Sequence, residues 1–177
     1  DKHYVDGVNK MKSKEYNAAI KEFKAAMKRY KRAKLSDNAL NYIRINMALS
    51  YAHTGNKQDM VAAKRYLDLV TPKIQSENNW NYNIAIAKNK TGDQLEASKI
   101  LSNVIKKNSG NFQAYVTLAA IYKESGNESD AEKTIERMQK AEDKLNQRKK
   151  KNVQANNNRQ TKTKKVKKKK VVLNPRG

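Results

Sequence analysis

Residues 111–138, NFQAYVTLAAIYKESGNESDAEKTIERM, decide the fold of this chain. The apolar residues of the first half recur at i, i+3, i+4 and i+7, which places them on one helix face: Tyr115, Leu118, Ala119 and Tyr122. Gly126 and Asn127 break the pattern. A second apolar stripe follows at Ala131, Ile135 and Met138. The stretch therefore predicts a helix, a tight turn and a second helix, a unit that cannot bury its apolar faces alone.

The same pattern occurs 34 residues earlier in the chain. The shift pairs residues of like character: Gly126 with Gly92, Ala131 with Ala97, Ile135 with Leu101, Leu118 with Ile84 and Ala119 with Ala85. This period and residue set resemble the tetratricopeptide repeat family over roughly residues 2–141. The resemblance implies an all-α fold, a right-handed α-solenoid of about four helix-turn-helix repeats, whose members are interaction scaffolds with differing partners.

We expect the repeat domain to span residues 1–150, with repeats at about 1–34, 36–75, 78–109 and 111–145. We expect eight helices, two in each repeat. The turns within the four repeats should lie near Ser13-Lys14, Gly55, Gly92 and Gly126. Ala62 follows Gly55 by seven residues, where the third and fourth repeats have five, which predicts two extra turn residues within residues 57–60. Pro72 predicts a kink or the last turn of the preceding helix.

Positive charge is concentrated at the two ends of the chain. The 39 Lys and Arg residues against 17 Asp and Glu give a net charge of +22. Residues 144–177 hold 14 of the basic residues and no acid, and residues 1–34 hold 11 basic and 4 acidic residues. Residues 35–143 are therefore close to neutral, between a basic first repeat and a strongly basic tail.

Composition argues against an enzyme. The chain has no cysteine, and its two histidines, His3 and His53, lack metal-ligand spacing. Neither a Gly-rich phosphate loop nor a Ser/His/Asp set is present, so we expect no catalytic site, no metal and no cofactor. No run of 18 apolar residues occurs, which excludes a transmembrane helix within this sequence.

Helix A of each repeat is expected to line a concave groove that binds a peptide or helix of a partner. Counting back from each turn glycine, the candidate groove residues are Tyr42, Asn46, Tyr82, Asn83, Asn89, Lys90, Thr117 and Lys123. Asn both donates and accepts hydrogen bonds, and Tyr offers rigid apolar area with a polar tip, a composition that suits peptide capture. The alternative is that these are ordinary solvated residues in an Asn-rich chain.

One sub-type of the family, the carboxylate clamp that holds chaperone C-termini, is matched only at Asn46. Tyr4 and Val8 stand in place of the clamp's lysine and asparagine, and Asn79 and Asn83 replace its basic pair. Binding of chaperone tails is therefore disfavoured.

The last helix is expected to continue to about Lys150, and residues 151–177 form a low-complexity tail that we expect to remain unfolded. Its densest charges are the candidate polyanion-binding residues Lys162, Lys164, Lys165, Lys167, Lys168, Lys169 and Lys170. Such a cluster binds nucleic acid, anionic membrane or an acidic polymer without reading sequence, and without aromatic residues it cannot stack on bases. The alternative is a solvated tail that aids solubility.

These features predict a non-catalytic adaptor within a larger complex, with a protein in its groove and an anionic membrane, wall polymer or nucleic acid on its tail. A nucleic-acid-associated protein whose repeats recruit other proteins is the alternative. A start at Asp1 rather than Met, with no cysteine, favours the cell envelope over the cytoplasm.

Overall fold

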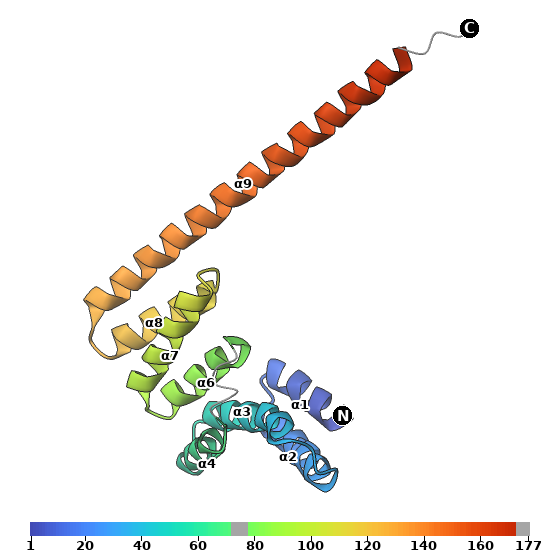
Figure 1. Cartoon of the computed structure of the whole chain (residues 1–177). Coiled ribbons are helices and arrows are strands. Elements are labelled where there is room, and N and C mark those ends of the chain that lie inside the picture. Colours follow the sequence, from blue (N-terminus) through green and yellow to red (C-terminus); the bar gives the residue numbers. More distant parts are fainter. Residues whose placement is uncertain (72–77, 173–177) are drawn as a thin grey trace. The chain divides into compact units, whose positions relative to one another are not determined.

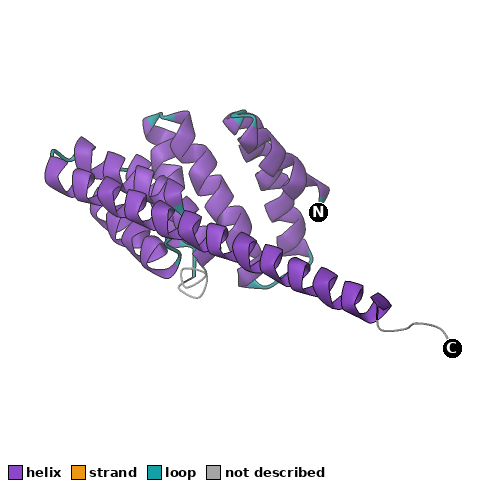
Figure 2. Cartoon of the chain, turned by 90° about the horizontal axis from the view of Figure 1, so that it is seen from above, coloured by secondary structure: helices purple, strands orange, loops and turns teal. Residues whose placement is uncertain are grey.

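The computed structural model describes the backbone of residues 1–71 and 78–172 and the side chains of residues 1–71 and 80–155. Within these ranges it contains eight helices and no strand (Figures 1 and 2). The helices are α1 (Lys2–Lys12), α2 (Tyr16–Arg32), α3 (Asp37–Thr54), α4 (Lys57–Asp68), α6 (Asn78–Lys90), α7 (Gln94–Lys107), α8 (Phe112–Glu124) and α9 (Glu128–Val172). Contacts divide the chain into two compact units, residues 1–135 and 136–177, which we describe separately.

The first unit is built from helix pairs, as the sequence predicted. Helix α1 packs against α2, α3 against α4 and α6 against α7. Successive pairs are joined where α2 meets α3, α3 meets α6 and α7 meets α8. Each pair therefore buries its apolar faces partly against the next pair, which is the arrangement that helical repeats require. The predicted all-α repeat fold is confirmed.

The predicted turns are also confirmed. Gly55, Gly92 and Gly126 have φ values of 84°, 90° and 74°, in the left-handed region that glycine adopts without steric cost. In the first repeat Lys14 takes the same place, with φ of 63°. These four residues provide a common reference for the register of the four repeats.

The predicted insertion of two residues after Gly55 was wrong. Helix α4 begins at Lys57, two residues after its turn glycine, just as α7 and α9 begin two residues after theirs. Asn56 caps this helix by accepting from the backbone N–H of Asp59 at 2.8 Å, and the Asp59 carboxylate accepts from Thr54 at 2.6 Å. The cap fixes the start of the helix, so Ala63 rather than Ala62 is fully buried.

In the first repeat α1 approaches α2 closely at Gly7. A Cβ atom at this position would lie 2.6 Å from the Phe23 ring, closer than packed atoms allow. Phe23 is fully buried and its ring centroid lies 6.0 Å from that of Tyr4. The missing side chain of Gly7 is therefore what admits a large aromatic residue into the core between these helices.

Aromatic residues alternate with lysines at the helix A position four residues before the turn residue. Tyr51 and Tyr122 hold this position in the second and fourth repeats, and Lys10 and Lys88 hold it in the first and third. Lys10 lies 3.4 Å from Glu22, and Lys88 lies 3.0 Å from Asp93.

Beside Lys88 lies a polar cavity of about 420 Å³ between α6 and α7. Its lining residues are Asn81, Lys88, Glu96, Ile100, Asn103 and Lys107.

The prediction of an unfolded segment after residue 150 was wrong for the backbone, because α9 continues to Val172. No Gly or Pro occurs within α9, and the next helix breaker is Pro175. Lys, Arg and Gln are strong helix formers, so low complexity alone does not stop the helix. Ala141 and Leu145 are half-buried, whereas residues 146–155 are all exposed. The side chains of the seven candidate tail lysines, and Pro72, lie outside the described residues.

Candidate partner-binding face

The predicted partner-binding residues lie on helices α3, α6 and α8, the first helices of three consecutive repeats. We use the term A-helix face for Tyr42 on α3, for Trp80, Tyr82, Asn83, Asn89 and Lys90 on α6, and for Thr117 and Lys123 on α8. Lys90 and Lys123 are exposed, and the other six are half-buried. This set contains seven of the eight predicted groove residues.

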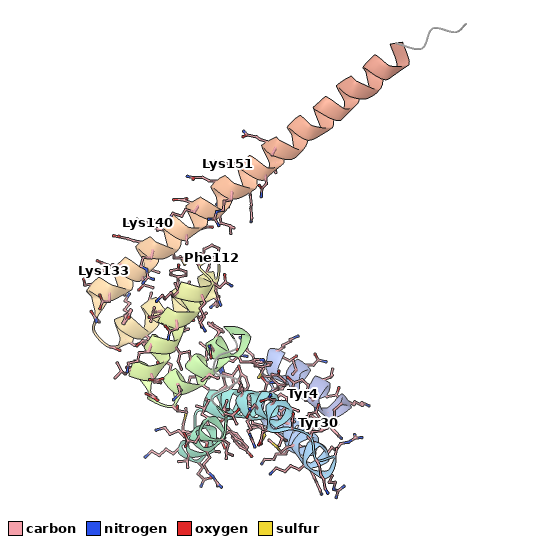
Figure 3. The ribbon with its side chains drawn as sticks, viewed as in Figure 1. Tyr4, Tyr30, Phe112, Lys133, Lys140 and Lys151 are labelled. Carbon is pink, nitrogen blue, oxygen red and sulfur yellow. The ribbon has the colours of Figure 1, made fainter. Side chains whose placement is uncertain are left out.

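The eighth predicted residue, Asn46, is not available to a partner. Only 2% of its surface is exposed, and its amide donates to the hydroxyl of Tyr4 at 3.2 Å. Burial raises the pKa of the Tyr4 hydroxyl, and the bond from Asn46 offsets part of that rise. Figure 3 shows Tyr4 and Tyr30 close together on α1 and α2. Asn46 therefore joins the first two repeats instead of contacting a partner.

A hydrogen bond of the same kind joins the third and fourth repeats. The hydroxyl of Tyr82 lies 3.1 Å from that of Thr117. Tyr82 lies ten residues before Gly92 and Tyr4 ten before Lys14, whereas Thr117 lies nine before Gly126 and Asn46 nine before Gly55. The two bonds therefore connect equivalent positions across two different repeat boundaries.

The boundary between the second and third repeats lacks this bond. Its equivalent positions hold Ile45, which is fully buried, and Asn83. An isoleucine side chain neither donates nor accepts a hydrogen bond. Within the residues that the structure describes, the Asn83 side chain makes no hydrogen bond. Asn83 thus occupies a joining position without the tyrosine that would engage it.

An aromatic pair, not predicted from the sequence, lies beside Asn83. The rings of Tyr42 and Trp80 lie 5.0 Å apart between centroids and are inclined by 39°. The sequence analysis identified Trp80 only as part of the apolar pattern of its repeat. Trp80 lies three residues before Asn83, so both residues lie on one side of α6. This spacing is the sequence signal that could have assigned Trp80 to the site.

Asn89 and Lys90 lie at the C-terminal end of α6. The Asn89 Oδ1 atom is buried and has no hydrogen-bond partner among the described residues. Lys90 lies near His53, whose ring stacks on Tyr16 at 4.6 Å. Burial, and secondarily the charge of Lys90, lowers the pKa of His53 and favours its neutral form. This end of the face combines an unsatisfied acceptor with an exposed cation.

The first unit also contains two further cavities, on other parts of its surface. One, of about 340 Å³, involves α4 and α6 and includes Lys64, Asp68 and Lys88 in its lining. The other, of about 480 Å³, lies between α7 and α8 beside Leu95 and Tyr122. Among the described residues there is no group of His, Cys, Asp or Glu that could hold a metal ion. None of the helices in those residues is long and apolar enough to cross a membrane.

Comparison with known proteins finds a repeat family that is similar to part of this chain. A family model described as a tetratricopeptide repeat matches residues 90–150. No curated protein matches the chain. Two crystal structures are among the solved structures that are similar to this chain. A crystal structure of MamA protein shares 16% identity, with a TM-score of 0.46, covering 82% of this chain and 92% of that one. A second, a crystal structure of MamA, shares 17% identity, with a TM-score of 0.44, covering 80% and 96%.

Proposed function

We propose that this chain, which carries tetratricopeptide-type repeats, is a non-catalytic adaptor that holds a peptide or helix of another protein on its A-helix face. Repeats of this family generally serve as protein-interaction scaffolds. The finer assignment, to this face and this kind of partner, is our proposal. It requires a surface that is both accessible and held in a fixed conformation.

The observation that carries the proposal is the position of Asn83. It is half-buried at the middle of the face, and its equivalents Asn46 and Thr117 are engaged by tyrosines of neighbouring repeats. Since Ile45 replaces that tyrosine and no other described residue bonds to Asn83, we propose that its amide offers both a donor and an acceptor to the backbone of a partner. A backbone group of the partner would then hydrogen-bond Asn83 at the second repeat boundary, as the hydroxyls of Tyr4 and Tyr82 bond Asn46 and Thr117 at the other two.

The side chains around Asn83 are held in place before a partner arrives. The contact of Tyr42 with Trp80 fixes two rings on one side, and the bond of Tyr82 to Thr117 fixes a third. Ordered aromatic side chains lose little conformational entropy on binding, which favours affinity. A partner segment that is apolar on one side and offers backbone hydrogen bonds therefore fits this surface.

The test combines Asn83→Ala with Lys90→Ala in the full chain. Neither side chain makes a hydrogen bond or ion pair among the described residues, so thermal stability should change little. The matched control is Asn103→Ala with Lys106→Ala, the same two residue types exposed on α7. Pull-downs should lose a partner with the first pair and retain it with the control. Recovery of the same partners by both pairs would exclude the face.

We also propose that the basic tail attaches the adaptor to an anionic partner. The chain from residue 144 to its end holds 14 Lys and Arg and no acid. A helical backbone from residue 144 to 172 distributes 13 of these charges over about 43 Å at 1.5 Å per residue. Figure 3 shows Lys140 and Lys151 projecting from α9.

Because clustered lysines bind polyanions by releasing counterions, binding should fall steeply with salt. The test replaces the seven candidate tail lysines by Gln and titrates salt against oligonucleotides and anionic vesicles. Loss of binding only to the oligonucleotides would favour the second candidate, a nucleic-acid-associated protein whose repeats recruit other proteins.

A further inference from the structure

One face of α2 carries a row of exposed cations. The members recur at helical spacing and lie within about 100° of arc at 100° per residue: Lys21, Lys24, Lys28, Lys31 and Arg32. We call this set the α2 stripe. It extends about 16 Å along the helix, with successive cations mostly three or four residues, or about 4.5–6 Å, apart.

Two of the four acids of the first repeat, Glu22 and Asp1, are engaged away from this stripe. Glu22 accepts from His3 at 2.7 Å and lies 3.4 Å from Lys10, both on α1. Asp1 lies 3.5 Å from Arg29, which is on another side of α2. Among the described residues, no carboxylate forms an ion pair with any member of the stripe.

Such a row opposes the folding of its own helix. Like charges three or four residues apart repel one another and lower helix stability. One member, Lys24, lies 5.7 Å from the centroid of the Tyr51 ring, which stabilises its cationic form. Among the residues that the structure describes, none of the other four lies over an aromatic ring in this way. A bound polyanion would remove the repulsion.

We propose that the α2 stripe binds the phosphodiester backbone of nucleic acid, at a site distinct from both the A-helix face and the tail. Phosphates place one negative charge at every nucleotide of a strand, and the stripe offers five cations within about 16 Å of helix to meet them. No large apolar side chain of α2 is exposed, so the helix has nothing to insert between lipids. Carboxylates on an acidic protein surface are interspersed with uncharged residues, whereas a nucleic acid strand is charged at every nucleotide.

The stripe contacts backbone and not bases. Its members are lysines and one arginine on flexible stems, and Tyr16 and Tyr30 of α2 are half-buried against other side chains. Without an exposed aromatic ring, bases cannot stack on this helix. Binding should therefore depend on salt and hardly on base sequence.

The experiment uses the full-length chain with the seven tail lysines replaced by Gln, so that the signal reports on the remaining residues. In this background Lys21, Lys28 and Lys31 are changed to Gln. The control changes Lys57, Lys64 and Lys106 to Gln, which removes the same charge from exposed positions on α4 and α7. Circular dichroism checks that both variants fold.

Binding of a labelled single strand of about 12 nucleotides is measured by anisotropy across a salt titration. The stripe variant should lower the slope of log affinity against log salt by about 2, and the control should leave it unchanged. In the unsubstituted chain the oligonucleotide should protect Lys21 and Lys28 from acetylation. Equal losses in both variants, or an unchanged slope in the stripe variant, would overturn the proposal. Anionic vesicles or polyglutamate showing the same dependence on the stripe would also overturn it.

Discussion

The hydroxyl of Tyr82 lies 3.1 Å from the hydroxyl of Thr117, and this bond joins the third repeat to the fourth. Tyr4 and Asn46 repeat the relationship at the first boundary, at 3.2 Å and at equivalent distances from the turn residues. The second boundary has Ile45 in place of the tyrosine, and Asn83 makes no side-chain hydrogen bond with the residues that the structure describes. The face that we propose for partner binding is therefore centred on an interruption in a structural pattern.

The bond of Tyr82 should be measurable in isolation. Tyr82→Phe keeps the ring and removes only the hydroxyl, so we expect a loss of about 0.5–1.5 kcal/mol in the free energy of unfolding. Urea unfolding monitored by circular dichroism gives this value. Tyr122→Phe, whose hydroxyl makes no hydrogen bond among the described residues, is the control. A loss of the same size in both variants would assign the effect to something other than Thr117.

Gly7 should not tolerate alanine, although alanine is the better helix former. The added methyl would lie 2.6 Å from the buried Phe23 ring, and such overpacking costs about 1–3 kcal/mol. In the Phe23→Leu variant, Gly7→Ala should cost less than it does in the wild type, because the smaller side chain leaves room for the added methyl. Thermal melts of the four proteins form a double-mutant cycle. Additive losses would show that the methyl group does not meet Phe23.

Acid should weaken the contact between α1 and α2. The bond from His3, followed by that from Lys10, lowers the pKa of Glu22 below its ordinary value of 4.5. A carboxylate with a lowered pKa stabilises the fold above its ordinary pKa and loses that contribution as the pH falls through the folded value. The wild type should melt above Glu22→Gln at neutral pH, and the gap should close below about pH 4. A constant gap across that range would contradict the ion-pair explanation.

The cavity beside Lys88 should accept a tyrosine. Tyr51 and Tyr122 hold the equivalent position in neighbouring repeats, and the cavity measures about 420 Å³. Burying an aromatic side chain gains about 1.5–3 kcal/mol, which exceeds the roughly 0–1 kcal/mol typical of an ion pair that is still in contact with solvent, as Lys88–Asp93 is. Lys88→Tyr should therefore raise the free energy of unfolding by about 1–2 kcal/mol. Lys99→Tyr, at an exposed position on α7, is the control and should have little effect.

The repeats could be predicted because their turns require unusual backbone. Gly55, Gly92 and Gly126 must adopt positive φ, and the apolar spacing on either side of them is helical. The start of α4 was misplaced because Ala62 was used as the reference, whereas the Asn56 cap fixes the register. Local chemistry at a helix end outweighed the position of one small residue.

The site was only partly predictable because hydrogen bonds between repeats depend on neighbours distant in sequence. Asn46 and Asn83 occupy the same position and are identical in type. Their difference comes from Tyr4 and Ile45, one repeat earlier in each case. Sequence spacing places a residue on a helix face, but it does not say whether the next repeat already uses that residue.

The length of α9 calls for its own test, because composition and backbone propensity disagree about it. Residues 144–172 lack acids, so neighbouring lysines repel one another, yet no Gly or Pro interrupts them. Ala155 lies on the exposed part of the helix, where proline costs about 3 kcal/mol locally and touches no core. Ala155→Pro should reduce far-ultraviolet ellipticity while leaving the melting temperature of the repeats unchanged. Ala155→Gln should preserve both. If Ala155→Pro leaves the ellipticity unchanged, repulsion among the lysines outweighs propensity in solution, and the tail would meet its anionic partner as a flexible chain.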